Sequence, residues 1–178
     1  MTEKPKYYIT TPIYYPSAKL HIGHTYCTSI ADSMARFKRL DGYEVMFLTG
    51  SDEHGQKIEQ KAEESGVTPI EYVDNIVALF KQLWKELNIS NDDFIRTTEE
   101  RHREVVQMLF QRAYDNGDIY LGKYEGWYCI PDETFWPENK LTPEHLCPDC
   151  GRSLQRISEE AYFFKMSKYA DRWMKFIE

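Results

Sequence analysis

The sequence predicts an α/β fold, and three observations point to it. Two short apolar runs of strand length are each followed by a helical stretch, an alternation typical of parallel sheets. After residue 117 the chain changes to short aromatic runs, prolines and clustered cysteines, which indicates a second, smaller domain. A hydrophobic content of 42% over 178 residues is sufficient for packed cores.

The first strand-helix unit starts close to the amino terminus. Residues 7–11, Tyr-Tyr-Ile-Thr-Thr, are aromatic or β-branched and predict a buried strand, which leads into a loop bracketed by Pro12 and Pro16. From Gly23 to Leu40 apolar residues recur at helical spacing, and Asp41-Gly42 ends the run with turn chemistry. The apolar positions that indicate this helix are Tyr26, Ile30, Met34 and Phe37.

The second unit repeats this order. Residues 44–49, Glu-Val-Met-Phe-Leu-Thr, predict a second strand, followed by Gly50-Ser51-Asp52 and a helical stretch to about Gly66. Strands joined through helices at this spacing indicate a parallel arrangement, as in one half of a doubly wound, Rossmann-like sheet. Ligands of such sheets bind at the carboxyl ends of the strands.

Two further helices are predicted before residue 117. Thr68-Pro69 with Glu71 has the pattern of an N-cap, a first-turn proline and a capping box. The next helix is expected to begin near Thr97, with Glu100 three residues on, and to end at Asn116-Gly117. Both helices are expected to turn an apolar face to the core. The apolar positions of the first are Val73, Ile76, Val77, Phe80, Trp84 and Leu87, and those of the second are Val105, Val106, Leu109, Phe110 and Ala113.

These patterns divide the chain into three parts. We expect residues 1–117 to form the first half of the Rossmann-like domain and residues 118–165 to form a small inserted connective domain. Residues 166–178 would start a helix that leads back to a second half of the sheet. Glu178 falls inside that predicted helix, so we expect the chain to be a fragment of a longer protein.

Charge and hydropathy narrow the class of protein. The net charge is −7, from 22 Lys and Arg against 29 Asp and Glu, so the chain has no overall attraction for a polyanion and any nucleic-acid contact must be local. No charged leader precedes an apolar stretch, and no run of about 18 apolar residues is long enough for a membrane helix. We therefore expect a soluble, cytoplasmic protein.

Two histidines lie where the first loop enters the first helix. In His21-Ile22-Gly23-His24, imidazoles three residues apart can share one side of a helix N-terminus. Unpaired backbone N–H groups and the helix dipole favour phosphate there, and Gly23 has no side chain to block a nucleotide. An isolated pair of this kind is more often incidental or structural, and a metal site would lack the acidic general base of His-Glu-x-x-His helices.

The surrounding sequence makes the pair more informative. Residues 16–24, Pro-Ser-Ala-Lys-Leu-His-Ile-Gly-His, lie between a predicted strand and a predicted helix and resemble the signature of class I aminoacyl-tRNA synthetases. The resemblance implies that an amino-acid carboxylate attacks the α-phosphate of ATP, supplied with magnesium, and that the aminoacyl group then passes to the 3′ end of tRNA. It also implies catalytic roles for His21 and His24 and, together with Gly23, ATP binding.

Two longer runs are more specific. YYITTPIYYPSAKLHIGHTY and FLTGSDEHG resemble the methionyl-tRNA synthetase family, and the similarity continues to the last residue. The resemblance implies L-methionine, ATP and tRNA(Met) as partners, with Ile13 and Tyr15 lining the methionine pocket and Asp52 binding the substrate ammonium. Asp52 also lies just past the second predicted strand, where a carboxylate can pair with an α-amino group. The alternative is that Asp52 caps the following helix.

Three of the four cysteines cluster late in the chain. Cys129-Ile130-Pro131-Asp132 and Cys147-Pro148-Asp149-Cys150 are two short turns separated by fourteen residues, and together they can form one tetrahedral, structural zinc site. Asp132 stands where the commoner four-cysteine knuckle of the family has sulfur, and His145 is the alternative fourth ligand. A metal-free packed turn is the other interpretation, since some members of the family lack the metal.

One motif invites a wrong assignment. Lys165-Met166-Ser167-Lys168 is similar to the Lys-Met-Ser-Lys-Ser loop that completes the ATP site of class I synthetases, but it directly follows Ala161-Tyr162-Phe163-Phe164, where a returning strand and the first turn of a helix are expected. We therefore reject the match. The residues leave two other functions open: a different nucleotidyltransferase with a His-x-Gly-His loop, or a non-catalytic zinc module that binds RNA or protein.

Overall fold

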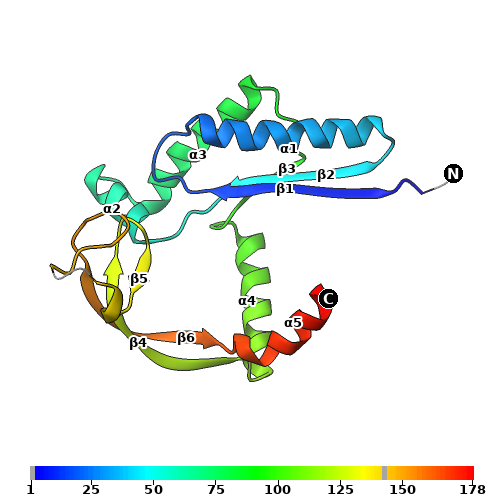
Figure 1. The fold of residues 1–178 in the computed structure, drawn as a ribbon. Coiled ribbons are helices and arrows are strands. Elements are labelled where there is room, and N and C mark those ends of the chain that lie inside the picture. The colour runs from blue at the N-terminus through cyan, green and yellow to red at the C-terminus, as the bar shows by residue number, and fades with distance from the viewer. Residues whose placement is uncertain (1–2, 142–143) are drawn as a thin grey trace. The chain divides into compact units, whose positions relative to one another are not determined.

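A computed structural model describes residues 3–141 and 144–178, and it divides into two compact units, residues 1–103 and 104–178 (Figure 1). The strands are β1 (Lys6–Tyr14), β2 (Glu44–Ser51), β3 (Asp93–Arg96), β4 (Ile119–Cys129), β5 (Thr134–Trp136) and β6 (Gln155–Phe164). The helices are α1 (Ile22–Leu40), α2 (Gln56–Glu64), α3 (Pro69–Glu86), α4 (Glu100–Asp115) and α5 (Ala170–Ile177), with 3-10 turns η1 (Glu138–Lys140) and η2 (Met166–Tyr169). None of the helices in the described ranges is long and apolar enough to cross a membrane.

The first unit contains the predicted parallel sheet. Its strand order is β1-β2-β3, with β2 in the middle and both pairings parallel. Helices α1 and α3 lie on the same side of this sheet (Figure 1), as expected for successive right-handed crossovers in one direction. The half-sheet is therefore confirmed, whereas the four-residue strand β3 was not predicted because its apolar content is too small to form a pattern.

Two clusters of buried side chains hold the helices to the sheet. Under α1, Ala31 and Ala35 pack on Phe47 of β2. Under α3, a larger cluster joins one residue of β1, three of the helix and one of β3, namely Tyr14, Val77, Phe80, Trp84 and Phe94. Burial of these apolar side chains gives the main driving force for the unit, and it fixes the strand ends relative to the helix starts.

Helix α1 forms where expected, but its large apolar residues are not its buried side. Tyr26, Ile30, Met34 and Phe37 are exposed, and the buried positions are Thr28, Ala31, Asp32 and Ala35. Small residues there let the helix approach the sheet closely. The apolar spacing therefore predicted the correct helix but not the face that packs in this unit.

Helix α3 agrees with the prediction, including its start. Thr68 is the N-cap, its hydroxyl and the Glu71 side chain form the reciprocal capping box, and Pro69 occupies the first turn. Four of the six predicted apolar positions are fully buried. Ile76 is partly buried against the same core, and Leu87 is 43% exposed because the helix ends at Glu86 and Leu87 is its C-cap.

Helix α4 corrects two expectations. It starts at Glu100 and not at Thr97, whose hydroxyl accepts a hydrogen bond from the Glu53 N–H (2.8 Å). Its apolar face is not buried: no described residue of α4 is buried, and Val105 and Leu109 are 51% and 54% exposed. Amphipathic spacing identifies a face that can be covered, but does not identify what covers it.

The second unit is built on a long antiparallel pair. Strand β4 pairs with β6 from Ile119 opposite Phe164 to Tyr128 opposite Gln155, and with the short β5 at its far end. A small core surrounds that far end, and its buried members are Cys129, Cys147 and Leu154, with Trp127 and Trp136 packed against them. The predicted insertion, residues 118–165, starts one residue before β4 and ends one residue after β6; its status as an inserted domain stays a prediction.

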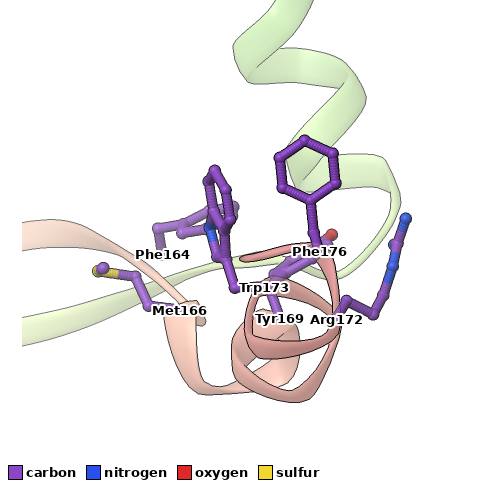
Figure 2. Close-up of a pocket in the computed structure, with 6 residues that line it drawn as sticks. All are labelled: Phe164, Met166, Tyr169, Arg172, Trp173 and Phe176. Atoms are coloured by element: carbon purple, nitrogen blue, oxygen red, sulfur yellow. The ribbon is translucent and has the colours of Figure 1, made fainter. Parts of the chain in front are cut away.

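The Lys165–Lys168 segment connects β6 to α5 and is bonded to the residues just before β4. It follows strand β6 and leads through η2 into α5, as predicted. The Lys168 ammonium and the Tyr169 hydroxyl both bond to the carboxylate of buried Asp118, and the Lys165 ammonium donates to the Gly117 carbonyl (2.8 Å). Next to these bonds, mostly exposed side chains line an open apolar hollow of about 500 Å³ (Figure 2): Phe164, Met166, Tyr169, Arg172, Trp173 and Phe176.

Candidate functional site

The two signature histidines cap helix α1 reciprocally. His21 is the N-cap residue, with an extended backbone at φ −123° and ψ 174°, and its Nδ1 accepts a hydrogen bond from the Gly23 N–H (3.1 Å). The His21 N–H in turn donates to Nδ1 of His24 (3.1 Å). The ring centroids lie 3.9 Å apart. The spacing of three residues thus produces a capping box made of imidazoles.

These hydrogen bonds determine the tautomer of both imidazole rings. Because each Nδ1 accepts a hydrogen bond, each neutral ring carries its proton on Nε2. Burial and the neighbouring His21 lower the pKa of His24, which favours the neutral form at pH 7. Two Nε2–H donors therefore stand at a helix N-terminus, where the remaining backbone N–H groups and the helix dipole also attract an anion.

Gly23 has a structural role in this cap. A Cβ added at residue 23 would lie 2.9 Å from Cε1 of His21, closer than side-chain carbons tolerate. The absence of a side chain therefore allows the His21 ring to fold back over the helix start. From the sequence, Gly23 was predicted to leave room for a nucleotide. In the structure, the histidine cap also requires a residue without a side chain at this position.

Tyr14 packs against the His24 ring, and the sequence analysis did not predict this contact. The buried Tyr14 ring meets the His24 ring edge-on, with centroids 4.9 Å apart, and the Tyr14 hydroxyl shares a hydrogen bond with Thr28 (2.7 Å). Burial raises the pKa of Tyr14. The available signal was strand alternation: Tyr14 lies between the two proposed pocket residues and so faces the opposite side, toward the helix.

The predicted methionine-binding residues come to the same edge of the sheet. Ile13, which is 41% exposed, and the half-buried Tyr15 lie at the end of β1, and Asp52 directly follows β2. The Asp52 N–H donates to the Tyr14 carbonyl (3.0 Å) and ties the two strand ends together. The alternative role of Asp52 as a helix cap is wrong, because the N-cap of α2 is Gly55 and no side chain caps that helix.

A buried carboxylate next to Asp52 also escaped the sequence analysis. Glu53 accepts two hydrogen bonds from Arg96 (2.6 and 2.9 Å) and one from Thr98 (2.5 Å). The guanidinium is further paired with Asp74 (2.6 Å), and both carboxylates raise the pKa of Arg96. The neighbouring His54 is exposed and contacts the Thr97 carbonyl through Nε2 (3.3 Å).

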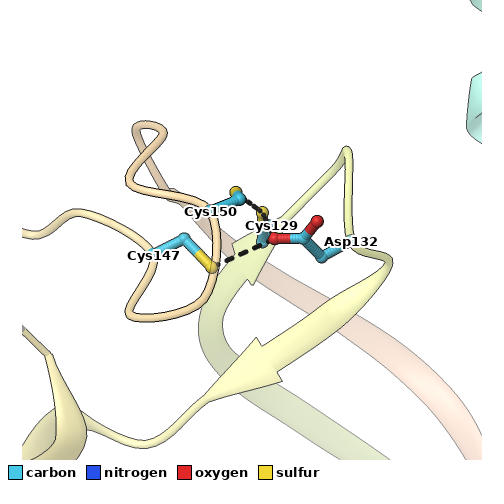
Figure 3. Close-up of side chains that lie close together, drawn as sticks. All are labelled: Cys129, Asp132, Cys147 and Cys150. Carbon is cyan, nitrogen blue, oxygen red and sulfur yellow. Dashed lines mark hydrogen bonds between the residues drawn. The ribbon is translucent and has the colours of Figure 1, made fainter.

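The four predicted metal ligands converge in the second unit. The ligand atoms of Cys129, Asp132, Cys147 and Cys150 all lie within 4.8 Å of one another (Figure 3). The thiols of Cys129 and Cys147 both point at the same Asp132 oxygen, at 3.2 Å, and the sulfurs of Cys129 and Cys150 are 3.6 Å apart. Three sulfurs and one carboxylate oxygen at this spacing fit a tetrahedral zinc ion.

The close packing of the cluster shifts the pKa values of Cys129 and Asp132 in opposite directions. Burial raises the pKa of Cys129 to about 12. Hydrogen bonds from the thiols hold the pKa of Asp132 below its usual value. His145, the alternative ligand, is outside this group; its ring lies against Trp127, with centroids 4.6 Å apart. The geometry therefore favours Asp132 as the fourth donor.

These features together define the class of protein. A parallel half-sheet whose strand ends meet a donor-rich helix N-terminus is the nucleotide-binding half of a Rossmann-type α/β domain. Residues 7–159 match the family described as tRNA synthetases class I (M), so the chain belongs to that family. The resemblance found in the two sequence runs is thereby confirmed.

Relatives within the family are close. The chain is 63% identical over 175 residues to the methionine–tRNA ligase of Clostridium tetani, covering 98% of this chain and 27% of that protein. It is 57% identical over 186 residues to that of Bacillus subtilis, covering 99% and 28%. The chain thus spans little more than a quarter of the length of these relatives.

A solved structure agrees with this assignment. Mycobacterium tuberculosis methionyl-tRNA synthetase, in complex with methionyl-adenylate, superposes with a TM-score of 0.90 at 41% identity. The match covers 97% of this chain and 34% of that one. The similarity therefore includes both units of the chain.

Proposed function

We propose that this chain carries part of the adenylation site of a methionine–tRNA ligase that acts in cytoplasmic protein synthesis. In the proposed reaction, a carboxylate oxygen of L-methionine attacks the α-phosphorus of ATP, and the bond to pyrophosphate breaks. The methionyl group of the adenylate then passes to a ribose hydroxyl at the 3′ end of tRNA(Met). The observation that carries the proposal is the reciprocal histidine cap, in which both Nδ1 atoms accept backbone hydrogen bonds and both Nε2–H groups remain as donors at a helix N-terminus.

The histidines act through position and charge. Negative charge grows on the phosphoryl oxygens as pyrophosphate leaves, and fixed donors stabilise it without reorganising. His21 and His24 meet this requirement because the cap holds each ring from the Nδ1 side and leaves Nε2–H to the substrate. Magnesium would arrive with ATP and share the neutralisation of charge. Gly23 leaves the backbone open beside them.

The second substrate would bind at the neighbouring strand ends. We assign Ile13 and Tyr15 to the methionine side chain, because they flank the inward-facing Tyr14 and so share the opposite side of β1. Asp52 is assigned to the α-ammonium. A carboxylate at this edge forms a charge-assisted hydrogen bond with an ammonium group and orients the attacking carboxylate of the same amino acid.

Zinc is assigned a structural role. Cys129, Asp132, Cys147 and Cys150 would hold it, and when bound it would tie the two turns together at the far end of β4. The fit rests on the donor set and its spacing. The four ligands belong to the second unit and the adenylation residues to the first, so no step of the reaction is assigned to the metal.

The test is methionine-dependent ATP–pyrophosphate exchange by the full-length protein that contains this chain. Asp52→Asn should raise the KM for methionine by roughly 10- to 100-fold, because the substrate ammonium loses its carboxylate counter-charge. The KM for ATP should stay nearly constant. An unchanged methionine KM in Asp52→Asn would overturn the assignment of this carboxylate, and exchange driven by another amino acid would overturn the substrate.

A further inference from the structure

The residue after Asp52 is a deeply buried and fully paired carboxylate. Glu53 is 3% exposed, and its two oxygens receive the Arg96 guanidinium, the Thr98 hydroxyl and the Ser51 hydroxyl. A buried charge is tolerated when such partners surround it, and it resists displacement because any movement leaves partners unpaired. Glu53 is therefore a fixed point in the loop that follows β2.

The backbone around Asp52 is anchored on both sides. On one side, the Asp52 N–H donates to the Tyr14 carbonyl at the end of β1 (3.0 Å). On the other, the Glu53 N–H donates to the Thr97 hydroxyl (2.8 Å), and the Thr97 N–H donates to the Ser51 carbonyl (3.3 Å). Residues beyond the regular strand are thus held by both neighbouring strand ends.

We propose that Glu53, with Thr97 and Thr98, is a positioning element that fixes the Asp52 carboxylate for the substrate ammonium. The proposal rests on the proposed function of Asp52. It requires that the network acts on Asp52 through the backbone, because a displacement of about 1 Å in a substrate-orienting group is enough to cost roughly 100-fold in rate. Glu53 itself need not touch either substrate.

The same network also braces the fold, since Arg96 joins Glu53 on the loop to Asp74 on α3. Truncation of Glu53 would leave the guanidinium without its buried partner and could unfold the unit. The threonines are better test positions. Thr98→Val and Thr97→Val each remove one hydroxyl from the network at nearly constant volume and leave the Glu53–Arg96 pair in place.

The experiment measures exchange kinetics and Tm in the full-length protein. Thr98→Val and Thr97→Val should each raise the KM for methionine about tenfold and leave the KM for ATP within about twofold. Thr98→Ser restores the hydroxyl and should recover the wild-type methionine KM. Asp93→Asn is the matched control, because it breaks a carboxylate–arginine pair with Arg101 (2.5 Å) at the opposite end of β3. That variant should lower Tm without a selective change in the methionine KM.

The outcomes separate the two proposals. If the threonine variants lower Tm but change neither KM selectively, Glu53 is a folding brace and the positioning role is overturned. Asp52→Asn, measured in parallel, reports on the substrate site itself: a raised methionine KM there keeps the proposed function even when the threonine variants fail. If Asp52→Asn also leaves the methionine KM unchanged, both the substrate site and the positioning role are overturned.

Discussion

The cysteine cluster and the histidine-bearing strand edge are two contrasting kinds of site. The cluster brings four ligand atoms within 4.8 Å of one another, and all four come from two turns of one unit. At the strand edge, by contrast, the candidate groups follow two strands and open a helix. The first site can be completed by an ion alone. The second needs substrates, and in the family it is part of a protein several times longer.

The difference lies in what specifies each site. A metal centre is specified by ligand chemistry, so three sulfurs and one oxygen at the right spacing already define it. A nucleotide edge is specified by backbone position, because any helix N-terminus supplies N–H groups and only the fold decides which one meets the ligand. The two regions should therefore respond differently to truncation, substitution and pH.

Truncation should give the largest contrast. The isolated 178-residue chain should bind one zinc ion and show no methionine-dependent ATP–pyrophosphate exchange, because relatives use a chain of which this is about 28%. Metal analysis and the exchange assay on the same preparation test the two parts of this prediction, zinc binding and the lack of exchange. Appreciable ATP–pyrophosphate exchange by the isolated chain would contradict this prediction. It would show that the strand edge, like the cysteine cluster, needs no residues outside this chain.

Loss of one cysteine sulfur should abolish metal binding and leave the residues at the strand edge of the first unit unaffected. Cys147→Ser removes a buried ligand, and zinc sites of this kind contribute roughly 10 kcal/mol or more of apparent binding free energy to folding. We expect the zinc content to fall to near zero and the second unit to lose protease resistance. Cys27→Ser is the matched control, since Cys27 lies in α1 outside the cluster. Stoichiometric zinc in Cys147→Ser would show that the cysteine is not a ligand.

Asparagine can separate the two roles of the histidines. Its side chain can reproduce the Nδ1 acceptor of the cap but has no counterpart of Nε2–H. In the full-length protein, His24→Asn should keep Tm close to wild type and lower kcat of exchange by roughly 100- to 1,000-fold, the usual loss for one electrostatic donor. His24→Ala should lose the cap as well and lower Tm by the equivalent of about 1 kcal/mol. Wild-type kcat in His24→Asn would restrict the histidine to capping.

The smallest expected effect is a pH dependence of stability in the first unit. The folded state lowers the pKa of His24 below its ordinary value of 6.5. The unfolded chain therefore takes up the proton first, and the stabilisation present above pH 6.5 is lost as the pH falls through that value. Between about pH 7.5 and 5, the isolated wild-type chain should lose more Tm than His24→Asn. If Tm changed with pH in the same way in the two proteins, the lowered pKa of His24 would be contradicted.

Local features of the fold were readable from the sequence because they depend on near neighbours. The capping box at Thr68 and Glu71, the turn at Asp41-Gly42 and the β-branched run of β1 each act over a few residues and appear where expected. Three sulfurs and a carboxylate likewise predicted a group of side chains that lie close enough together to hold a metal ion. In each case the residue type carries the chemistry.

Which face of an element is covered could not be read in this way. The large apolar stripe of α1 and the apolar positions of α4 have helical spacing, yet both are exposed in the described chain. Burial depends on what lies opposite, and the close approach of α1 to the sheet selects alanine and threonine there. Periodicity identifies the helix and leaves its partner open.

By itself, the sequence determined two strands of the half-sheet, the positions of the histidine pair and Asp52, and the four side chains of the candidate metal site, because spacing and residue type are sufficient for these. Only the tertiary structure decided that Tyr14 supports His24, that Thr97 binds the loop rather than capping a helix, and that Glu53 is buried against Arg96. Those contacts join residues 10 to 44 positions apart. Pairings over such distances are created by the packing of strands and helices, and no local pattern encodes them.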